Sequence, residues 1–354
     1  MNIGIDVRKL RDFGIGTHIR NVVLHAIRQD PAHNYFLFCH PRDLANNDSS
    51  GLWIPEESSK YSVKEHFSLA RQAREYRLDF YHSPHYTLPM MLHCPSLVTI
   101  HDLIHFRFRQ FFPAWKVKAA EIVIKRAVNR AAVIVTVSQT TRQDILEFLP
   151  KAEGKVEVLY NRLDEEWFGP PPGMDLSAMG IAREYLLYVG NFKKHKGIAT
   201  LIDAYSRIPD PPPLVLVGKT GEVDSELNDR ILAQPRIRLL GYADRPLLHQ
   251  LYSQALLFVM PSLYEGFGYP PLEAMSAGTP VLSSDAPALR EVLAGGVEFF
   301  ERGNAESLKE KLEMLMQSEA RRRELGSAGR ARARFFATEE SPRKLLDIYR
   351  RFSK

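Results

Sequence analysis

Short apolar strands alternate with amphipathic segments of helical length along nearly the whole chain of 354 residues, and the alternation runs in two series. Alternation of this kind is typical of βαβ units built around parallel sheets. The strands expected in the first series are residues 2–7, 35–39, 78–81, 97–100, 132–137 and 156–159. Those expected in the second are residues 185–189, 214–217, 237–240, 256–260, 281–283 and 297–300. Two Rossmann-like α/β domains are therefore predicted, each with a doubly wound parallel sheet.

A proline- and glycine-rich stretch at 169–175 separates the two series, and it can sustain neither a helix nor a strand. A chain of this length is also too long for one ordinary core. We therefore expect a first domain at 1–166, a hinge at 167–182 and a second domain at 183–337, with a cleft between the domains. The last segment, 338–354, contains a helix that starts near Ser341-Pro342 and is expected to pack back on the first domain.

The composition is that of a folded, water-soluble chain, with 45% apolar and 25% charged residues. The net charge of +5 at pH 7 is mild and is spread through both halves, so nucleic acid is not an expected partner. Cys39 and Cys94 provide neither a disulfide framework nor a metal-binding pair, which favours a reducing compartment. The first residues enter a strand at once, and no run reaches the roughly 18 apolar residues of a spanning helix. These features predict a cytoplasmic location, at most with contact at the inner face of the membrane.

Small, polar and cationic residues follow the expected strands in both halves. Ligands of open α/β sheets bind outside the carboxyl ends of the strands, so these residues are candidates for a ligand site between the domains. In the first half they are Gly14, Gly16, His82, His101, Asp102 and Ser138. In the second half they are Gly190, Asn191, Lys193, Lys194, Lys196, Lys219, Gly241, Tyr242 and Glu265.

The densest constellation runs from residue 261 to residue 280 and contains two glutamates, Glu265 and Glu273. Glycines beside Glu265 let the backbone of its loop approach a ligand closely. Pro270-Pro271 opens a helix where proline is tolerated, and this places Glu273 in the first helical turn, where a carboxylate can accept both hydroxyls of a ribose. The alternative is a helix-capping glutamate beside an unrelated loop glutamate, which explains either residue alone but not the whole pattern.

This stretch resembles the signature of the retaining nucleotide-sugar glycosyltransferases with the GT-B fold, and of glycosyltransferase family 4 in particular. Gly14-Ile15-Gly16 is similar to the family's glycine loop near the donor diphosphate, and His101-Asp102 to its pair near the transferred sugar. The family's donor domain opens with a segment similar to 188–197. Its turn against the nucleobase is similar to 240–242, and its segment after the glutamates is similar to 284–292. The resemblance implies donor binding by Gly14, Gly16, Gly190, Asn191, Lys196, Lys219, Tyr242, Glu265, Gly266, Phe267, Gly268, Tyr269 and Glu273.

Three residues are expected to carry the chemistry. Lys196, helped by N–H groups near Gly16, would stabilise the negative charge that develops on the leaving diphosphate. Glu265 would bind donor-sugar hydroxyls and stabilise positive charge in the transition state, and His101 would lie beside the sugar. The alternatives are a solvated turn of lysines around Lys196 and a structural histidine at a strand end. His82, His101, Asp102 and Ser138 are expected on the acceptor side.

Two positions depart from the family pattern. Asn191 stands where many members have an arginine that, together with the lysine, binds the donor diphosphate. Lys193 or Lys194 would then supply this second positive charge. The alternative is an inactive subunit that only binds nucleotide-sugar. Asn161-Arg162 replaces the usual Asn-Gly, which leaves the geometry of the hinge open. No Asp-x-Asp motif occurs, so metal-independent transfer with no cofactor is expected. His101 and His105 have the spacing of two metal ligands on a helix. However, His101 ends a strand and 106–112 is predicted to be a loop, so no metal site is expected there.

The acceptor side is less defined. Residues 103–130 carry seven lysines and arginines against one acid, Glu121, among several large aromatic residues. Such a segment can lie on an anionic membrane, although a helix with a core-facing apolar stripe and solvated charges explains it equally. Resemblance to bacterial mannosyltransferases of surface polysaccharides implies GDP-mannose and a glycan or lipid-linked acceptor, and a UDP-sugar is the alternative. A dinucleotide oxidoreductase is disfavoured because Gly14-Ile15-Gly16 lacks the third glycine of its fingerprint.

Overall fold

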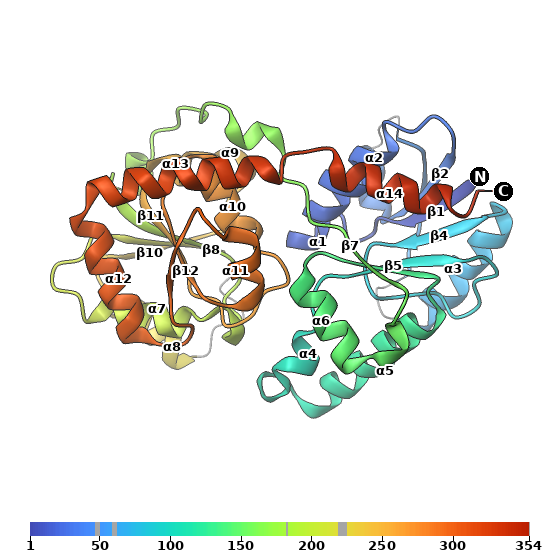
Figure 1. The fold of residues 1–354 in the computed structure, drawn as a ribbon, viewed down its shortest axis with the longest axis horizontal. Helices are drawn as coiled ribbons and strands as arrows, with labels where there is room; N and C mark the ends of the chain where they lie inside the picture. Colours follow the sequence, from blue (N-terminus) through green and yellow to red (C-terminus); the bar gives the residue numbers. More distant parts are fainter. Residues whose placement is uncertain (47–49, 59–61, 182, 219–224, 354) are drawn as a thin grey trace. The chain divides into compact units, whose positions relative to one another are not determined.

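The computed structural model describes residues 1–46, 50–58, 62–181, 183–218 and 225–353 (Figure 1). The chain forms two compact units. Unit 1 consists of Met1–Arg162 together with Thr338–Lys354, and unit 2 consists of Leu163–Ala337. Each unit is built on its own parallel sheet, as the two series of strands predicted.

Within the described residues, the sheet of unit 1 has seven strands in the order β3-β2-β1-β4-β5-β6-β7, all paired in parallel. They are β1 (Asn2–Asp6), β2 (Asn34–Cys39), β3 (Leu52–Pro55), β4 (Phe80–Ser83), β5 (Ser96–Ile100), β6 (Val133–Thr136) and β7 (Val156–Val158). Six of these were expected from the sequence. The seventh, β3, was not, because its apolar run at residues 52–54 is short, lies at a sheet edge and ends in proline, which counts against a strand.

The helical segments of unit 1 include one irregular stretch, η1, which is a π-helical turn that continues directly from α1. They are α1 (Phe13–His18), η1 (Ile19–Leu24), α2 (His25–Ile27), η2 (Pro41–Asn46), α3 (Val63–Glu75), α4 (Ile104–Arg107), η3 (Arg109–Phe111), α5 (Ala114–Arg130), α6 (Gln139–Phe148), η4 (Pro150–Ala152) and α14 (Glu340–Arg350). The prediction of a loop at 106–112 was wrong in part, since α4 and η3 occupy much of it. Buried Phe106 anchors α4 to the core, which outweighs the weak helical propensity of its aromatic residues.

Successive residues of the strands in unit 1 feed two hydrophobic clusters on opposite faces of the sheet. Phe80 and Leu97 belong to one cluster, and their neighbours Tyr81 and Val98 to the other. This is the alternation that a strand buried on both faces requires. The first cluster also contains Leu345, Ile348 and Tyr349 of α14, so this helix completes the core of unit 1. Figure 1 shows α14 beside α2.

Unit 2 has six parallel strands in the order β10-β9-β8-β11-β12-β13 within its described residues. They are β8 (Tyr185–Val189), β9 (Leu214–Val217), β10 (Ile237–Gly241), β11 (Ala255–Met260), β12 (Val281–Ser284) and β13 (Glu298–Phe300). All six were expected, with boundaries that agree to within one residue. Continuous apolar runs such as Leu214–Val217 make buried parallel strands easy to recognise.

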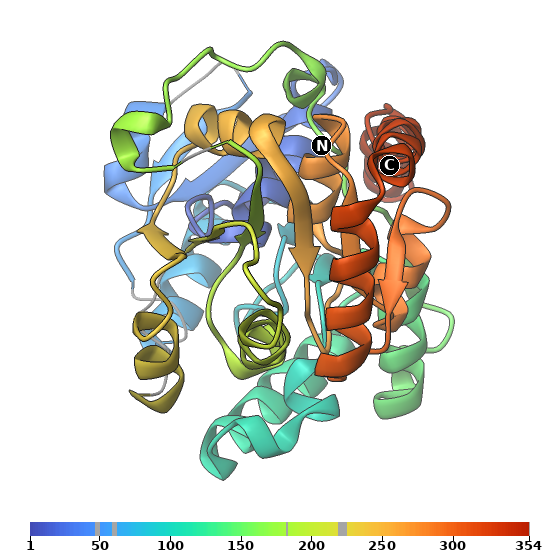
Figure 2. The ribbon, with the colours of Figure 1, turned by 90° about the vertical axis from the view of Figure 1, so that its left-hand side faces the viewer.

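Helices flank these strands on both sides, and Figure 2 shows α12 running beside the sheet. The helical segments are η5 (Glu165–Phe168), η6 (Ser177–Met179), η7 (Lys194–Lys196), α7 (Ile198–Ser206), α8 (Ser225–Leu232), α9 (Arg245–Gln254), α10 (Tyr269–Ser276), α11 (Pro287–Leu293), α12 (Ala305–Gln317) and α13 (Glu319–Phe335). The loops that follow β8 and β11 lie at the carboxyl edge of this sheet, where the sequence places its candidate residues.

Candidate functional site

Lys196 and Glu265, 69 residues apart in the chain, form an ion pair at the carboxyl edge of the sheet in unit 2. The Nζ atom of Lys196 donates to Oε1 of Glu265 at 2.6 Å, and the side chains are 15% and 10% exposed. Ser262 donates its hydroxyl to the same carboxylate oxygen at 2.7 Å. Two expected catalytic residues are thus brought together, and each neutralises the other. A ligand with negative charge can therefore bind the ammonium group only by sharing it with Glu265 or by displacing the carboxylate.

The turn that carries Lys196 is fixed against the loop that carries Glu265. Gly197 adopts a positive φ of 68°, and a Cβ atom there would lie 2.0 Å from the carbonyl oxygen of Pro261. The Leu263 N–H also donates to the His195 carbonyl at 2.8 Å. Only glycine fits this close backbone approach. Gly197 therefore helps to align the ion pair, although the sequence marked it only as the last residue of the segment 188–197.

Glu273 lies beyond the first turn of α10, because that helix begins at Tyr269, and the predicted first-turn position was wrong. The two prolines lie in the first turn of the helix, as expected, and Gly268 is its N-cap residue, which was not predicted. The carboxylate is buried, and Tyr252 of α9 donates its hydroxyl to Oε2 of Glu273 at 2.9 Å. Burial, and next the nearby carboxylate, raise the pKa of Tyr252 far above its ordinary value, so the phenol stays a donor. Sequence reasoning missed Tyr252, since nothing local distinguishes it from a core tyrosine.

The other candidates of unit 2 differ in exposure. Tyr242, just after β10, is 72% exposed, whereas Phe267 and Tyr269 are buried against each other with ring centroids 5.5 Å apart. Asn191 lies at the end of β8, where its side-chain oxygen accepts from the Lys193 N–H at 3.3 Å. Lys193 and Lys194 are exposed, and Gly190 and Gly266 are half-buried. Lys219 lies outside the described residues.

In unit 1, His101 directly follows β5 and is only partly exposed. Its Nε2 atom lies 2.9 Å from the carbonyl oxygen of Pro84, which requires the proton on Nε2 and leaves Nδ1 as an acceptor in the neutral ring. Burial lowers the pKa of His101, although the Pro84 carbonyl and Asp102 oppose the shift. Asp102 accepts from the Ile104 N–H at 3.0 Å and so begins α4. His101 is therefore a neutral imidazole, and the hydrogen bond of Asp102 fixes the backbone beside it.

His82 and Ser138 are fully buried, which does not fit the expected contact with an acceptor. His82 faces Tyr349 of α14, with Nδ1 at 2.6 Å from the phenol oxygen, and burial lowers its pKa to about 3. Ser138 caps α6 by accepting from the Thr141 N–H at 3.0 Å. Both residues therefore have structural partners inside unit 1.

Gly14 and Gly16 lie within helix α1, so the expected glycine loop is helical. A Cβ atom on Gly16 would lie 2.2 Å from the carbonyl oxygen of Leu10, and its N–H already donates to Asp12. Gly16 therefore serves close packing, and its own N–H is not available to a phosphate group. Gly14 is exposed, and nothing lies within 4 Å of a Cβ atom placed there.

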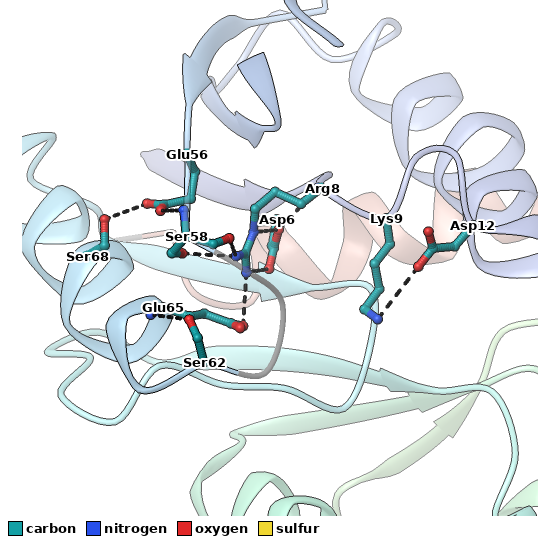
Figure 3. A network of polar contacts seen from close by, with 9 residues as sticks. All are labelled: Asp6, Arg8, Lys9, Asp12, Glu56, Ser58, Ser62, Glu65 and Ser68. Atoms are coloured by element: carbon teal, nitrogen blue, oxygen red, sulfur yellow. Dashed lines mark hydrogen bonds and ion pairs between the residues drawn. The ribbon is translucent and has the colours of Figure 1, made fainter. Parts of the chain in front are cut away.

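A buried charge network lies at the carboxyl end of β1 (Figure 3). Arg8 donates to Asp6 at 2.7 and 2.8 Å and to Glu65 of α3 at 2.9 Å. A third contact joins Arg8 to Ser58 at 3.3 Å. Burial opposes the charge of Arg8, but Asp6 and Glu65 outweigh it and raise the pKa of the guanidinium group. The network ties β1, the segment 56–58 and α3 together, and sequence reasoning did not single it out.

Two negative findings apply to the described ranges. No group of three or more histidine, cysteine, aspartate or glutamate side chains is arranged there to hold a metal ion. In the same residues, every helix is too short or too polar to cross a membrane.

Two family models match the chain. The model described as Glycosyltransferase Family 4 matches residues 14–167, and Glycosyl transferases group 1 matches residues 181–332. The O-antigen chain mannosyltransferase B of Escherichia coli is 28% identical over 288 residues, which cover 78% of this chain and 75% of that protein. The alpha-maltose-1-phosphate synthase of Mycobacterium tuberculosis is 30% identical over 288 residues, or 73% of each chain. The chain therefore belongs to the group 1, family 4 glycosyltransferases.

The fold agrees with this assignment. The structure of Anabaena Alr3699/HepE in complex with UDP-glucose superposes with a TM-score of 0.82 at 17% identity, covering 99% of both chains. The two Rossmann-like units are thus those of the GT-B fold. The protein is an enzyme that transfers a hexosyl group from a nucleotide-sugar donor.

Proposed function

We propose that this enzyme transfers mannose from GDP-mannose to a glycan or lipid-linked acceptor, with retention of the anomeric configuration. The observation that carries the proposal is the pairing of Lys196 with Glu265, because it puts a cation and a carboxylate at one point of a donor domain. The name of the 28% identical mannosyltransferase supports mannose as the transferred sugar. A UDP-sugar, such as the UDP-glucose in the HepE complex, is the second candidate.

The ion pair suggests how the donor is received. The diphosphate attracts the ammonium group of Lys196, which then opposes the negative charge developing on the leaving group. Glu265 keeps the hydrogen bond from Ser262 and turns its remaining acceptor capacity toward sugar hydroxyls. A carboxylate in this role stabilises the positive charge of the sugar in the transition state.

The remaining residues have supporting roles in the proposal. Glu273, oriented by Tyr252, binds the ribose hydroxyls, and exposed Tyr242 lies against the base. The acceptor nitrogen Nδ1 of neutral His101 binds a hydroxyl of the transferred sugar. We propose no direct substrate contact for His82 or Ser138, because both are buried.

The experiment that tests the function is a transfer or donor-hydrolysis assay with GDP-mannose, comparing the native chain with Glu265→Gln. Glu310→Gln, an exposed glutamate on α12, is the matched control. We expect a large loss of turnover in Glu265→Gln and none in the control. Equal turnover in both variants would defeat the assigned role of Glu265, and an inverted product anomer in the NMR spectrum would defeat retention.

Nucleotide choice is tested by thermal shift with GDP, UDP, ADP and dTDP, because a ligand of the native state raises the melting temperature. GDP is expected to give the largest shift. A larger shift with UDP would replace GDP-mannose by a UDP-sugar, and no shift with any nucleotide would contradict donor binding itself.

We also propose that α5 contacts an anionic membrane during transfer to a lipid-linked acceptor. Trp115 and Ile122, seven residues apart and so on one helix face, are 69% and 58% exposed, and exposed Lys118 lies between them. Vesicles with and without anionic lipid test this contact by co-sedimentation of the native chain and of a Trp115→Ala, Ile122→Ala double variant. Equal sedimentation of both proteins would remove the proposed role of this face.

A further inference from the structure

His18 is a buried histidine at the end of α1 that neither the sequence motifs nor the proposed function used. Its ring packs edge-to-face against the ring of His101, with centroids 5.0 Å apart and an interplanar angle of 84°. The ring also makes a hydrogen bond, because Nδ1 of His18 lies 2.8 Å from the side-chain oxygen of Asn161. His18 therefore stands between His101, which follows β5, and the segment that follows β7.

The contact with Asn161 defines the state of the His18 ring. An amide oxygen only accepts, so Nδ1 of His18 carries the proton and the ring is a fixed tautomer. Burial, and after it the nearby His101 ring, lower the pKa of His18 well below its ordinary value, so the ring is neutral at neutral pH. The ring can therefore pack closely on the neutral His101 ring without placing a positive charge beside it.

Asn161 is itself held in place. It is buried and precedes Arg162, the last residue of the first segment of unit 1. Asn21 of the π-helical turn donates to the Arg162 carbonyl at 3.3 Å, and Arg162 pairs with Glu339 at 3.1 Å. The π-helical turn and the 161–162 segment are thus joined at two points, His18 with Asn161 and Asn21 with Arg162. Such turns occur frequently at functional sites.

The His101 ring needs this support. A single hydrogen bond, from Nε2 to the Pro84 carbonyl, fixes one atom of the ring, and the terminal torsion of a histidine is otherwise broad. The edge-to-face contact with His18 restricts that torsion. We propose that His18, held by Asn161, is a positioning residue that fixes the orientation of the His101 ring for the sugar. The inference rests on the role proposed for His101.

Graded substitutions in the full-length enzyme test the proposal. His18→Ala removes both contacts, whereas His18→Phe keeps a ring against His101 and loses only the hydrogen bond. We expect kcat with GDP-mannose to fall about ten- to a hundred-fold in His18→Ala, with KM roughly unchanged, because a misplaced group costs turnover more than binding. His18→Phe should recover part of that loss, and Asn161→Ala should resemble His18→Phe.

His33→Gln is the control, since His33 is another histidine of unit 1 and its partners are Asp30 and Ser353. It should leave kcat unchanged. A purely structural role of His18 predicts instead that kcat and the folded fraction decline together in every variant. That outcome, or an unchanged kcat in His18→Ala, would overturn the proposal.

A second measurement does not depend on activity. Imidazole nitrogen NMR spectra of the native protein should show His101 with its proton on Nε2, and His18→Ala should shift the population toward the other tautomer. Unchanged His101 signals in His18→Ala would overturn the positioning role even if kcat falls. Full activity in His101→Ala would instead defeat the function proposed for His101, and the spectra would still decide whether His18 orients that ring.

Discussion

The carboxyl edges of the two sheets carry different kinds of chemistry. In unit 2, Lys196 and Glu265 are charged, partly exposed and paired across 69 residues of chain. In unit 1, His18, His82 and His101 lie close together, and burial lowers the pKa of each. Unit 2 thus holds opposite charges against each other at its edge, whereas unit 1 holds a cluster of largely buried, neutral imidazole rings.

Removal of the cation of unit 2 is expected to have the largest effect. Lys196→Met should lower turnover by about a hundred- to a thousand-fold, because a fixed charge that meets a leaving group stabilises the transition state strongly. Lys194→Met, two residues away and exposed, is the matched control and should change turnover little. Steady-state kinetics with GDP-mannose compares the two. A similar loss in both would mean that the lysine turn acts only as a diffuse positive surface.

The neutral histidines of unit 1 should make its stability sensitive to acid. An unfolded histidine binds a proton near pH 6.5, whereas native His82 does so only near pH 3, so the unfolded state takes up more protons as pH falls. Stability should therefore decline from about pH 6.5 downward, and His82 alone contributes a loss of about 3 kcal/mol by pH 4.5. Denaturant unfolding at several pH values measures this slope.

His82→Gln should flatten the slope of the unfolding free energy between pH 6.5 and pH 4.5, since glutamine does not titrate. Thr99→Val is the control. It removes the hydroxyl that lies 3.5 Å from Nε2 of His82 and adds no titrating group, so the native slope should remain. An unchanged slope in His82→Gln would show that His82 is not neutral in the folded protein.

The two glycines of α1 differ in how closely other atoms pack around them. Gly16→Ala should destabilise the protein by about 1–3 kcal/mol, because its methyl group would overlap the Leu10 carbonyl. Gly14→Ala has open space and should be neutral or slightly stabilising, since alanine favours a helix. Thermal melts without nucleotide give both values. Equal melting temperatures of the two variants would contradict the close approach at Gly16.

The smallest expected effect concerns the orientation of Glu273 in unit 2. Tyr252→Phe removes one hydrogen bond to the carboxylate and should weaken GDP binding by up to about tenfold, the low end of the effect of a hydrogen bond to a charged group, because the bond orients Glu273 and does not itself contact GDP. Tyr205→Phe, which loses a hydrogen bond to the Pro212 carbonyl, is the control. Isothermal titration calorimetry measures both affinities. A larger loss of GDP affinity in Tyr205→Phe than in Tyr252→Phe would contradict the role of Glu273 in nucleotide binding.

The strands of both sheets were largely predictable because buried parallel strands are continuous apolar runs, as in Leu214–Val217. The edge strand Leu52–Pro55 was missed, because its apolar run is short and ends in proline. Glu273 was expected in the first helical turn but lies just beyond it, because the helix begins at Tyr269, one residue before the prolines that were taken as its start.

Within the site, the sequence marked Lys196 and Glu265 separately, but their contact depends on how the loops after β8 and β11 meet. His18 and Tyr252 were missed because their partners, Asn161 and Glu273, are distant in the chain. Motifs identify groups that touch ligands more readily than groups that orient them.

The contribution of α14 to the core of unit 1 has a consequence for synthesis of the chain. Leu345, Ile348 and Tyr349 pack with residues of β1 and β2, yet a ribosome makes them only after the whole of unit 2. Unit 2 is continuous in the chain and can fold as soon as it emerges. Unit 1, although made first, must wait with an incomplete hydrophobic face until its last helix arrives. During synthesis, unit 1 is therefore expected to aggregate or to bind chaperones more readily than unit 2.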